Sequence, residues 1–267
     1  MAVDDLAGRR VDATRGALLS RPPVRRTEFG AGPDRDPAEL ADRLDELAGL
    51  RINYDRADGP VSAEDPGWHV DDGRAVIGHE RPGPPEPDGP WERAGCIVRD
   101  YGFTDHRRLR GAYRASAPLL GRDMLLEGRF AILRFHLGVR VTDVVDTERD
   151  GHRIWGWSYE TLTGHLEQGL LTYEVDKDMT SGVVTFRIRA FSRRAPVPNP
   201  LYRLGFALFG RAVQLGFYHS AGRRVRALVA REPPGPEPDV DTGVVVAPDS
   251  PRRRSDRWAV HVYQPGV

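Results

Sequence analysis

The sequence predicts an α+β fold in which a curved antiparallel sheet is wrapped around a long C-terminal helix. Between residues 94 and 191 the chain carries a series of short β-rich runs. In the last of these runs apolar and polar side chains alternate, so that one face of the strand is buried and the other is wet, which is typical of an antiparallel sheet. Over about 199–230, apolar residues instead recur at steps of three and four, which predicts a helix. The apolar face of the last strand holds Val184, Phe186, Ile188 and Ala190, and the polar face holds Thr185, Arg187 and Arg189.

The chain divides into a tail, a domain and a second tail. Residues 1–35 show no sustained hydrophobic period and are rich in Arg, Asp, Gly and Pro, which predicts a disordered N-terminal tail. Residues 36–231 form the predicted domain. Residues 232–267 begin with a proline-rich linker and continue as a C-terminal tail, in which 258–263 alternates and can add to a sheet edge.

The first half of the domain begins with a helix. Asp36 is a good N-cap, Pro37 suits the first helical position, and leucines on one face predict a helix that ends at Gly49. The run at 82–90 is a loop by composition. The apolar run at 96–98 is strand-like, and 107–120 is compatible with a helix that ends near Pro118.

The second half reads as strands followed by the long helix. Asn199 and Pro200 supply an N-cap and a first-turn proline for that helix, and its glycines predict a bend or a close approach to a neighbouring surface. The predicted strands are 130–135 and 139–145, separated by Gly138, then 153–161, and then 170–175 and 183–191, joined by a turn at 180–182.

Composition narrows the class of function. Lys+Arg and Asp+Glu both number 39, so the formal net charge is zero, and we expect no nucleic-acid partner. No apolar run is long enough for stable membrane insertion. Cys96 is the single cysteine, which excludes a disulfide within the chain and favours a cytoplasmic protein. The scattered histidines lack metal-ligand spacing, so we expect no metal and no cofactor.

A sheet that grips a helix often leaves a cavity between the two, and aromatic side chains then line it. On the predicted sheet, Trp155, Trp157 and Tyr159 share one strand face. The helix offers further aromatic residues. A filled aromatic core without a cavity explains the same pattern, and both interpretations stay open. The helix residues expected to line the cavity are Phe206, Phe209, Phe217 and Tyr218.

A polar cluster accompanies these aromatic residues. His165 titrates near neutral pH and can act as general acid or base, Glu167 can orient it, and Arg193 can hold a carboxylate or phosphate. These three are the candidate catalytic residues. The alternative is a structured turn, in which Arg193 pairs with Glu167 and no catalysis occurs. The other members of the cluster are Tyr159, Thr161 and Ser192.

Residues 156–167 read GWSYETLTGHLE. This segment resembles the pattern G-F-x-Y-G-T-L-P-G-H-P-E of the "domain of unknown function 1990" family, and three shorter blocks resemble other motifs of the family in the same order along the chain. The resemblance covers roughly residues 50–231. It implies an architecture similar to the helix-grip, START-like superfamily of ligand-binding proteins. The shorter blocks are Ile52-Asn53-Tyr54-Asp55, Ala190-Phe191-Ser192-Arg193 and Gln214, which the resemblance adds to the candidate ligand-binding residues.

The chain departs from the family pattern at several positions. Leu170 and Leu171 stand where the pattern has two glutamates, so any chemistry that relatives perform with those carboxylates is absent here. Glu160 replaces a glycine and puts a carboxylate nearby. The other departures are Thr163, Leu166 and Arg194, each in place of a proline.

Two classes of function follow. The first, which we favour, is binding of a small apolar or amphipathic ligand in a hydrophobic cavity between sheet and helix. The second is an enzyme that acts on such a ligand by general acid–base chemistry, as a cyclase, hydrolase or isomerase would. The two leucines at 170 and 171 favour binding, because they remove the most ionisable positions of the motif. A fold of this kind supports either function.

Overall fold

The computed structural model describes residues 28–31, 36–58, 67–130, 132–196, 211–231, 235–249 and 254–263. The helices in these ranges are α1 (Pro37–Leu47), α2 (Pro90–Arg99) and α4 (Arg211–Val229), with short 3-10 helices η1 (Arg56–Asp58) and η2 (Arg254–Trp258). The strands are β1 (Glu28–Ala31), β2 (His69–His79), β3 (Leu109–Arg114), β4 (Asp123–Phe130), β5 (Leu133–Arg149), β6 (His152–Thr161), β7 (Glu167–Asp178), β8 (Val183–Arg194), β9 (Val244–Ala247) and β10 (Val260–Tyr263).

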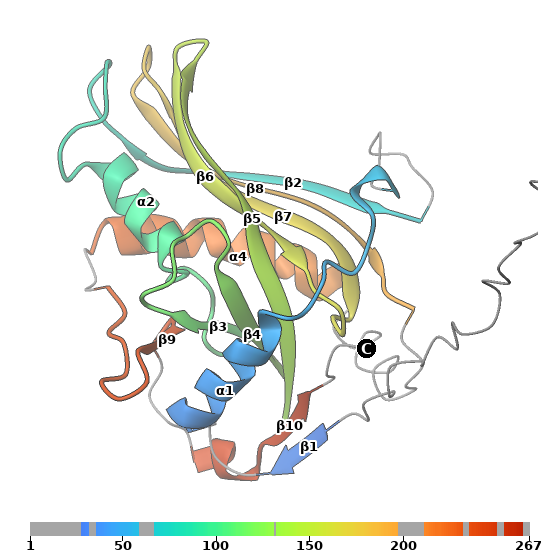
Figure 1. Cartoon of the computed structure of the whole chain (residues 1–267). Helices are drawn as coiled ribbons and strands as arrows, with labels where there is room; N and C mark the ends of the chain where they lie inside the picture. The colour runs from blue at the N-terminus through green and yellow to red at the C-terminus, as the bar shows by residue number, and fades with distance from the viewer. Residues whose placement is uncertain are drawn as a thin grey trace, which may run out of the picture.

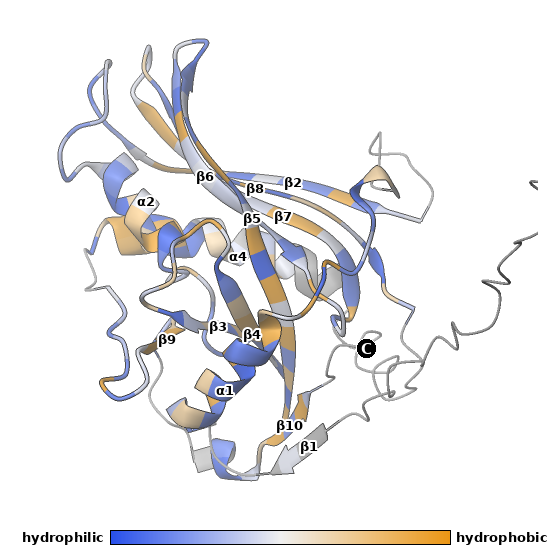
Figure 2. Ribbon diagram, in the orientation of Figure 1, coloured by the Kyte–Doolittle hydropathy of each residue, from blue (hydrophilic) through white to orange (hydrophobic). Residues whose placement is uncertain are grey.

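The strands form one ten-stranded sheet with the path β2-β8-β7-β6-β5-β4-β3-β9. Every pair on this path is antiparallel. The sheet curves strongly, and α4 crosses behind it in Figure 1, while α1 lies in front of β4 and β5. The predicted curved sheet with a C-terminal helix is therefore confirmed. Figure 2 shows apolar and polar residues following one another along the strands, as a sheet with two different faces requires.

The long β5 ribbon organises the two sides of the sheet. Its first half pairs with β4, and its second half, from Val139, pairs with β6. The strand runs through Gly138, where the sequence predicted a break. A Cβ atom on Gly138 would lie 2.7 Å from a methyl carbon of Leu47, so the glycine serves the close approach of α1 rather than a turn.

Two predicted elements have the wrong type. Residues 96–98 belong to helix α2, whose first turn carries the helix-start signals Pro90 and Glu92. Cys96 is exposed on this helix. Residues 109–114, predicted as helix, form β3 between β4 and β9. Pairing with two strands outweighs the weak helical preference of this short stretch, which reads LRGAYR.

Helix α1 agrees with its prediction. The Asp36 side chain accepts a hydrogen bond from the backbone N–H of Ala38, and Leu40, Leu44 and Leu47 are buried. They pack on Leu125 of β4, on the outer face of the sheet. The opposite, concave face of the same strand carries Leu126, which belongs to the main core.

Three strands of the sheet, β1, β9 and β10, come from the segments that the sequence analysis assigns to the two tails. β9 pairs with β3, and β10 lies parallel to β5, beside residues 133–136 and beyond the end of β6. β1 pairs with β10. The alternating residues at 258–263 thus add to the sheet within the same chain. The boundary at residue 231 stays a prediction, but the sheet extends past it.

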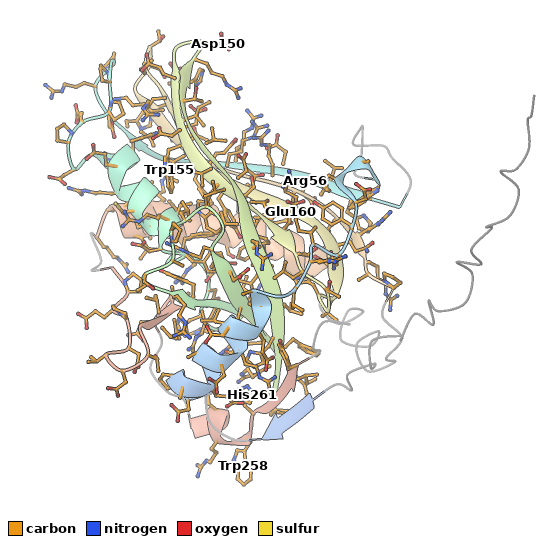
Figure 3. The ribbon with its side chains drawn as sticks, viewed as in Figure 1. Arg56, Asp150, Trp155, Glu160, Trp258 and His261 are labelled. Atoms are coloured by element: carbon orange, nitrogen blue, oxygen red, sulfur yellow. The ribbon has the colours of Figure 1, made fainter. Side chains whose placement is uncertain are left out.

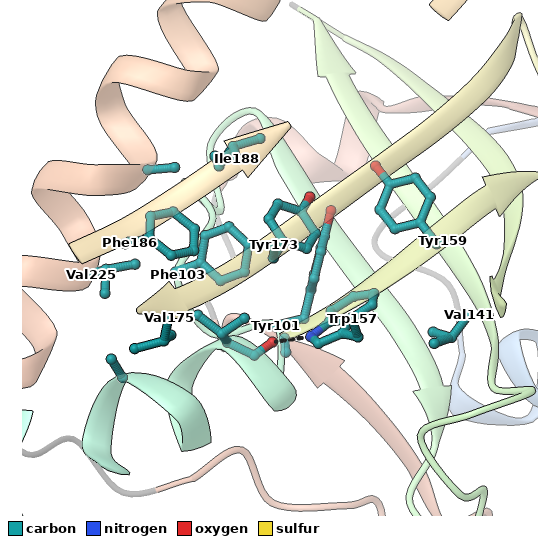
Figure 4. Close-up of a cluster of buried hydrophobic side chains, with 14 of the residues drawn as sticks. Tyr101, Phe103, Val141, Trp157, Tyr159, Tyr173, Val175, Phe186, Ile188 and Val225 are labelled. Carbon is teal, nitrogen blue, oxygen red and sulfur yellow. Dashed lines mark hydrogen bonds between the residues drawn. The ribbon is translucent and has the colours of Figure 1, made fainter. Parts of the chain in front are cut away.

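An aromatic core fills one end of the concave face (Figure 4). Tyr101, Phe103 and Tyr173 are fully buried, with ring centroids 4.9–6.1 Å apart. α2 and the second half of α4 cover this end through Val98 and Val225. A Cβ atom on Gly222 would lie 2.5 Å from that of Ala75, which explains one helix glycine as a close approach to β2.

A buried ion pair fixes the loop that leads from β2 into α2. Lys177 Nζ lies 2.7 Å from Glu80 Oε2, and both side chains are fully buried. Glu80 also accepts the backbone N–H groups of Glu86 and Trp91, and Lys177 donates to the carbonyl of Pro84. The pair therefore ties the proline-rich loop to β7 with its polar atoms satisfied.

Replacing Lys177 with methionine tests this pair. The change leaves the Glu80 carboxylate buried without its counter-charge, and we expect a loss of about 3–5 kcal/mol in the free energy of unfolding, measured in urea. Arg74→Met is the control, because Arg74 and Asp72 form an exposed pair, worth about 0–1 kcal/mol. Equal losses in the two variants would contradict the role given to Lys177.

Candidate functional site

The β6–β7 hairpin carries most of the family-like motif, and a crossing segment, residues 51–56, holds it in place. Asn53 is the centre of this contact. Its backbone N–H donates to the carbonyl of Thr161 at 3.1 Å, and its side-chain amide donates to the carbonyl of Glu167 at 2.8 Å. Gln168 donates back to the carbonyl of Asn53. Residues more than 100 positions apart in the chain thus fix the end of the hairpin.

The Thr161 hydroxyl adds two hydrogen bonds to this contact. It donates to Oδ1 of Asn53 at 2.6 Å and accepts the N–H of Gly169 at 3.0 Å. We call residues 51–56, with the hydrogen bonds that they make to the β6–β7 hairpin, the clasp. Any Cβ at Gly169 would lie 2.1 Å from the carbonyl oxygen of Phe191, so the tight packing of β7 against β8 requires glycine here. Thr161 and Gly169 therefore have structural tasks that account for their place in the motif.

Glu160 anchors the same segment on the outer face of β6 (Figure 3). Its carboxylate accepts the Tyr54 hydroxyl at 2.6 Å and forms a forked ion pair with Arg56. Burial alone would raise the pKa of Glu160, but the hydrogen bonds from Arg56 and Tyr54 outweigh it and lower that pKa. Burial, followed by the hydrogen bond to Glu160, raises the pKa of Tyr54 well above its usual value.

A cavity of about 570 Å³ lies on the other, concave side of this hairpin, against α4. Most of its wall is carbon. The apolar lining residues come from β3, β4, β5, β7, β8, α4 and the β6–β7 turn, and they are Leu109, Leu126, Phe135, Leu137, Leu166, Leu170, Leu171, Ala190, Phe191 and Phe217. The polar lining residues are Arg108, Arg129, Tyr159, Thr161, His165, Glu167, Ser192 and Tyr218.

The sequence left open whether the aromatic residues fill a core or line a cavity, and the structure contains both, at different ends of the sheet. Trp157 is buried in the aromatic core, where its indole N–H donates to the carbonyl of Val98 at 3.2 Å, and Trp155 packs near Gly95 of α2. Neither is among the cavity-lining residues. Two positions further along β6, Tyr159 lines the cavity. The core is therefore filled beside α2 and hollow beside the hairpin.

Some of the other predicted ligand-binding residues line the cavity, and the rest lie outside the described part of the structure. Thr161, Phe217 and Tyr218 line the cavity. Phe206 and Phe209 lie outside the described residues. Gln214 lies in α4, but its side chain is outside the described part of the structure.

The predicted catalytic trio is not brought together as a trio. His165 and Glu167 line the cavity, but Nδ1 of His165 contacts the backbone of Glu167 rather than its carboxylate. Arg193 is not a lining residue. Its Nε donates to Gln168 at 2.8 Å, and its guanidinium lies 4.5 Å from the ring centroid of Trp68. The roles proposed for these residues in catalysis stay predictions.

The hydrogen bond from the Glu167 N–H, at 2.9 Å, determines the chemical form of His165. A backbone N–H always donates, so Nδ1 accepts, and the ring proton of a neutral imidazole is on Nε2. Burial lowers the pKa of His165 to about 4. At neutral pH the side chain is therefore an uncharged donor on the cavity wall.

Sequence reasoning missed several lining residues. Leu126 on β4 and Leu137 on β5 face the cavity, and the alternation along these strands was the available signal. Leu171 also lines the wall, next to Tyr159 in register. At this position, where the family pattern has a glutamate, this chain therefore gives the cavity an apolar wall.

One group among the described residues has the composition of a metal site. Ligand atoms of Glu127, His136 and His261 lie within 4.8 Å of one another, on β4, β5 and β10. The 125 positions between the histidines hid this group from spacing arguments. His136 Nε2 lies 2.9 Å from His261 Nδ1, and Glu127 pairs with Arg129, so hydrogen bonds account for these contacts. The absence of a metal stays a prediction.

The chain belongs to the family described as "Domain of unknown function (DUF1990)", whose sequence model matches residues 55–224. It is 32% identical over 182 residues to a UPF0548 protein of Deinococcus radiodurans, covering 64% of this chain and 89% of that protein. Residues 55–224 include the β6–β7 hairpin and the residues that line the cavity.

Two solved structures are similar at low identity. A hypothetical protein of Helicobacter pylori has a TM-score of 0.40 at 12% identity, over 67% of this chain and 96% of that one. The protein Ara h 8.0201 has a TM-score of 0.35 at 9% identity, over 62% of this chain and 99% of that one. In the described part of this chain, no helix is long and apolar enough to cross a membrane.

The state of His165 predicts a pH dependence of stability. An unfolded histidine has a pKa near 6.5, so between about pH 6.5 and 4 the unfolded chain binds a proton that the folded chain does not. Stability therefore falls as the pH is lowered through this window, by at most roughly 3 kcal/mol from this residue.

The measurement compares urea unfolding of the wild type and His165→Gln at pH 7 and pH 4.5. We expect the stability difference between the two proteins to shrink, or to change sign, at the lower pH. His69→Gln, at an exposed position on β2, is the control and should keep the wild-type slope. Parallel pH curves for wild type and His165→Gln would contradict a neutral buried imidazole.

Proposed function

We propose that this protein binds a small apolar or amphipathic molecule in the cavity between the concave face of the sheet and α4. The observation that carries the proposal is the cavity itself. Its volume of about 570 Å³ falls within the usual range for small-molecule sites, about 300–1,000 Å³. Carbon side chains dominate its wall, and a few polar groups interrupt it, which is the usual composition of such a site.

The polar groups support binding of an uncharged or weakly polar ligand. His165 is neutral at physiological pH, and burial keeps the Tyr159 hydroxyl protonated by raising its pKa. The two arginines of the lining differ. Arg129 is buried and paired with Glu127, whereas Arg108 is exposed on the loop before β3. The cavity thus combines a mainly apolar wall with the exposed charge of Arg108, the paired charge of Arg129 and the acidic residue Glu167.

The alternative, an enzyme using His165, Glu167 and Arg193, has less support. An imidazole with a pKa of about 4 is a weak base at neutral pH. Arg193 interacts with Gln168 and Trp68 instead of the cavity. We therefore favour a binding protein. We also propose a cytoplasmic location, on the basis of the single cysteine.

The test fills the cavity by one substitution. Ala190 lines the wall opposite Leu171 in register and is 7% exposed, so Ala190→Leu adds three carbons to the cavity. The uncharged dye N-phenyl-1-naphthylamine, which fluoresces in apolar surroundings, serves as the probe. We expect the wild type to bind it and Ala190→Leu to bind about tenfold more weakly, equivalent to roughly 1.4 kcal/mol.

The same change at an exposed position, Ala115→Leu, is the matched control and should bind like the wild type. Thermal melting of both variants establishes that they are folded. Failure of the wild type to bind the dye, or equal binding by the two leucine variants, would contradict a ligand in this cavity.

A further inference from the structure

Three tyrosines meet where the filled core ends and the cavity begins. Tyr159 lines the cavity, and Tyr101 and Tyr173 lie behind it in the core. The ring centroid of Tyr173 lies 6.0 Å from that of Tyr159 and 6.1 Å from that of Tyr101. In Figure 4 the hydroxyl groups of the three tyrosines lie toward one another.

Among the described residues, the hydroxyls of Tyr101 and Tyr173 have only each other and the Tyr159 hydroxyl as possible hydrogen-bond partners. Both side chains are fully buried, so neither hydroxyl reaches bulk water. Hydroxyls that face only one another satisfy part of their hydrogen-bonding capacity, and a buried polar group left without a partner costs about 1–3 kcal/mol. The neighbouring rings of Phe103 and Phe186 offer carbon only, and Trp157 already donates its N–H to Val98.

The three hydroxyls are donors at any physiological pH. Burial raises the pKa of Tyr101, Tyr159 and Tyr173 well above the usual value for tyrosine. The cluster therefore offers uncharged O–H donors in apolar surroundings. Such a cluster suits an oxygen acceptor without charge, because burying a carboxylate here without a cation would be costly.

We propose that the ligand carries an uncharged hydrogen-bond-accepting oxygen, as in a ketone, ester or ether, which accepts a hydrogen bond from Tyr159 at the inner end of the cavity. Tyr101 and Tyr173 stand behind Tyr159 and complete the polar site. The apolar body of the ligand then lies along the leucine wall, toward Leu171 and Leu126. This inference rests on the proposed binding function and specifies its ligand class.

The test uses three rigid probes that differ in one group: 2-acetylnaphthalene, 2-ethylnaphthalene and 2-naphthoate. A fluorescence titration measures how well each probe displaces N-phenyl-1-naphthylamine from the protein. Tyr159→Phe removes the hydroxyl and keeps the ring. We expect this change to weaken 2-acetylnaphthalene binding about three- to tenfold, as for loss of one hydrogen bond, and to leave 2-ethylnaphthalene within about twofold.

Tyr113→Phe is the matched control. Tyr113 is also buried, but it donates to the carbonyl of Asp100 and is not a lining residue, so both probes should bind this variant as they bind the wild type.

The outcomes separate the two proposals. If the wild type does not bind the dye, the binding function itself fails. If the dye binds but 2-acetylnaphthalene does not displace it, binding stands and the proposed ligand class is overturned. If the probes bind but Tyr159→Phe affects the ketone and the ethyl compound equally, binding stands and the tyrosine site is overturned. Tightest binding of 2-naphthoate, weakened by Arg108→Gln instead of Tyr159→Phe, would also overturn it, because the polar end would then be an anion at Arg108.

Discussion

The hydrogen bonds between residues 51–56 and the β6–β7 hairpin are the constraint on which the candidate site depends. Asn53 and Thr161 exchange hydrogen bonds across more than 100 positions of chain, and Glu160 holds Tyr54 and Arg56 on the outer face. The inner face of the same hairpin carries Tyr159, His165 and Leu171. Because the clasp fixes the backbone from outside, the cavity wall can stay open inside without support from a filled core.

The hollow and the filled parts of the concave face are made by the same strands. Along β6, Trp157 is buried under α2, whereas Tyr159 borders empty volume. The difference arises from what covers each end. α2 adds Val98 and Trp91 to the aromatic core, while the hairpin end faces Phe217 and Tyr218 of α4 across the cavity. A close-packed core and a binding cavity therefore coexist beneath one sheet.

Two polar groups of the cavity wall, His165 and Tyr159, are uncharged at neutral pH. His165 gives its Nδ1 to a backbone N–H, so the ring proton is on Nε2, and its low pKa keeps it uncharged. The tyrosine cluster adds protonated hydroxyls. Leu171 provides carbon next to Tyr159, at a position where the family pattern has a carboxylate. These features favour recognition of an apolar ligand by hydrogen-bond donors over acid–base chemistry.

The sequence by itself determined the elements whose signals are local. The α1 cap at Asp36, the alternating faces of β8 and the turn before it are encoded by neighbouring residues, and they agree with the structure. The family motif also placed Tyr159, Thr161, His165 and Glu167 near one another, and all four line the cavity.

Only the tertiary structure decided the features that depend on distant partners. The sequence assigned 109–114 to a helix, but these residues pair with β4 and β9, from separate parts of the chain. It placed Arg193 with His165, but the strand face turns Arg193 toward Trp68. It left open whether the aromatic residues fill the core or line a cavity. That outcome depends on how α2 and α4 cover the sheet, and packing of this kind leaves no periodic signal in the sequence.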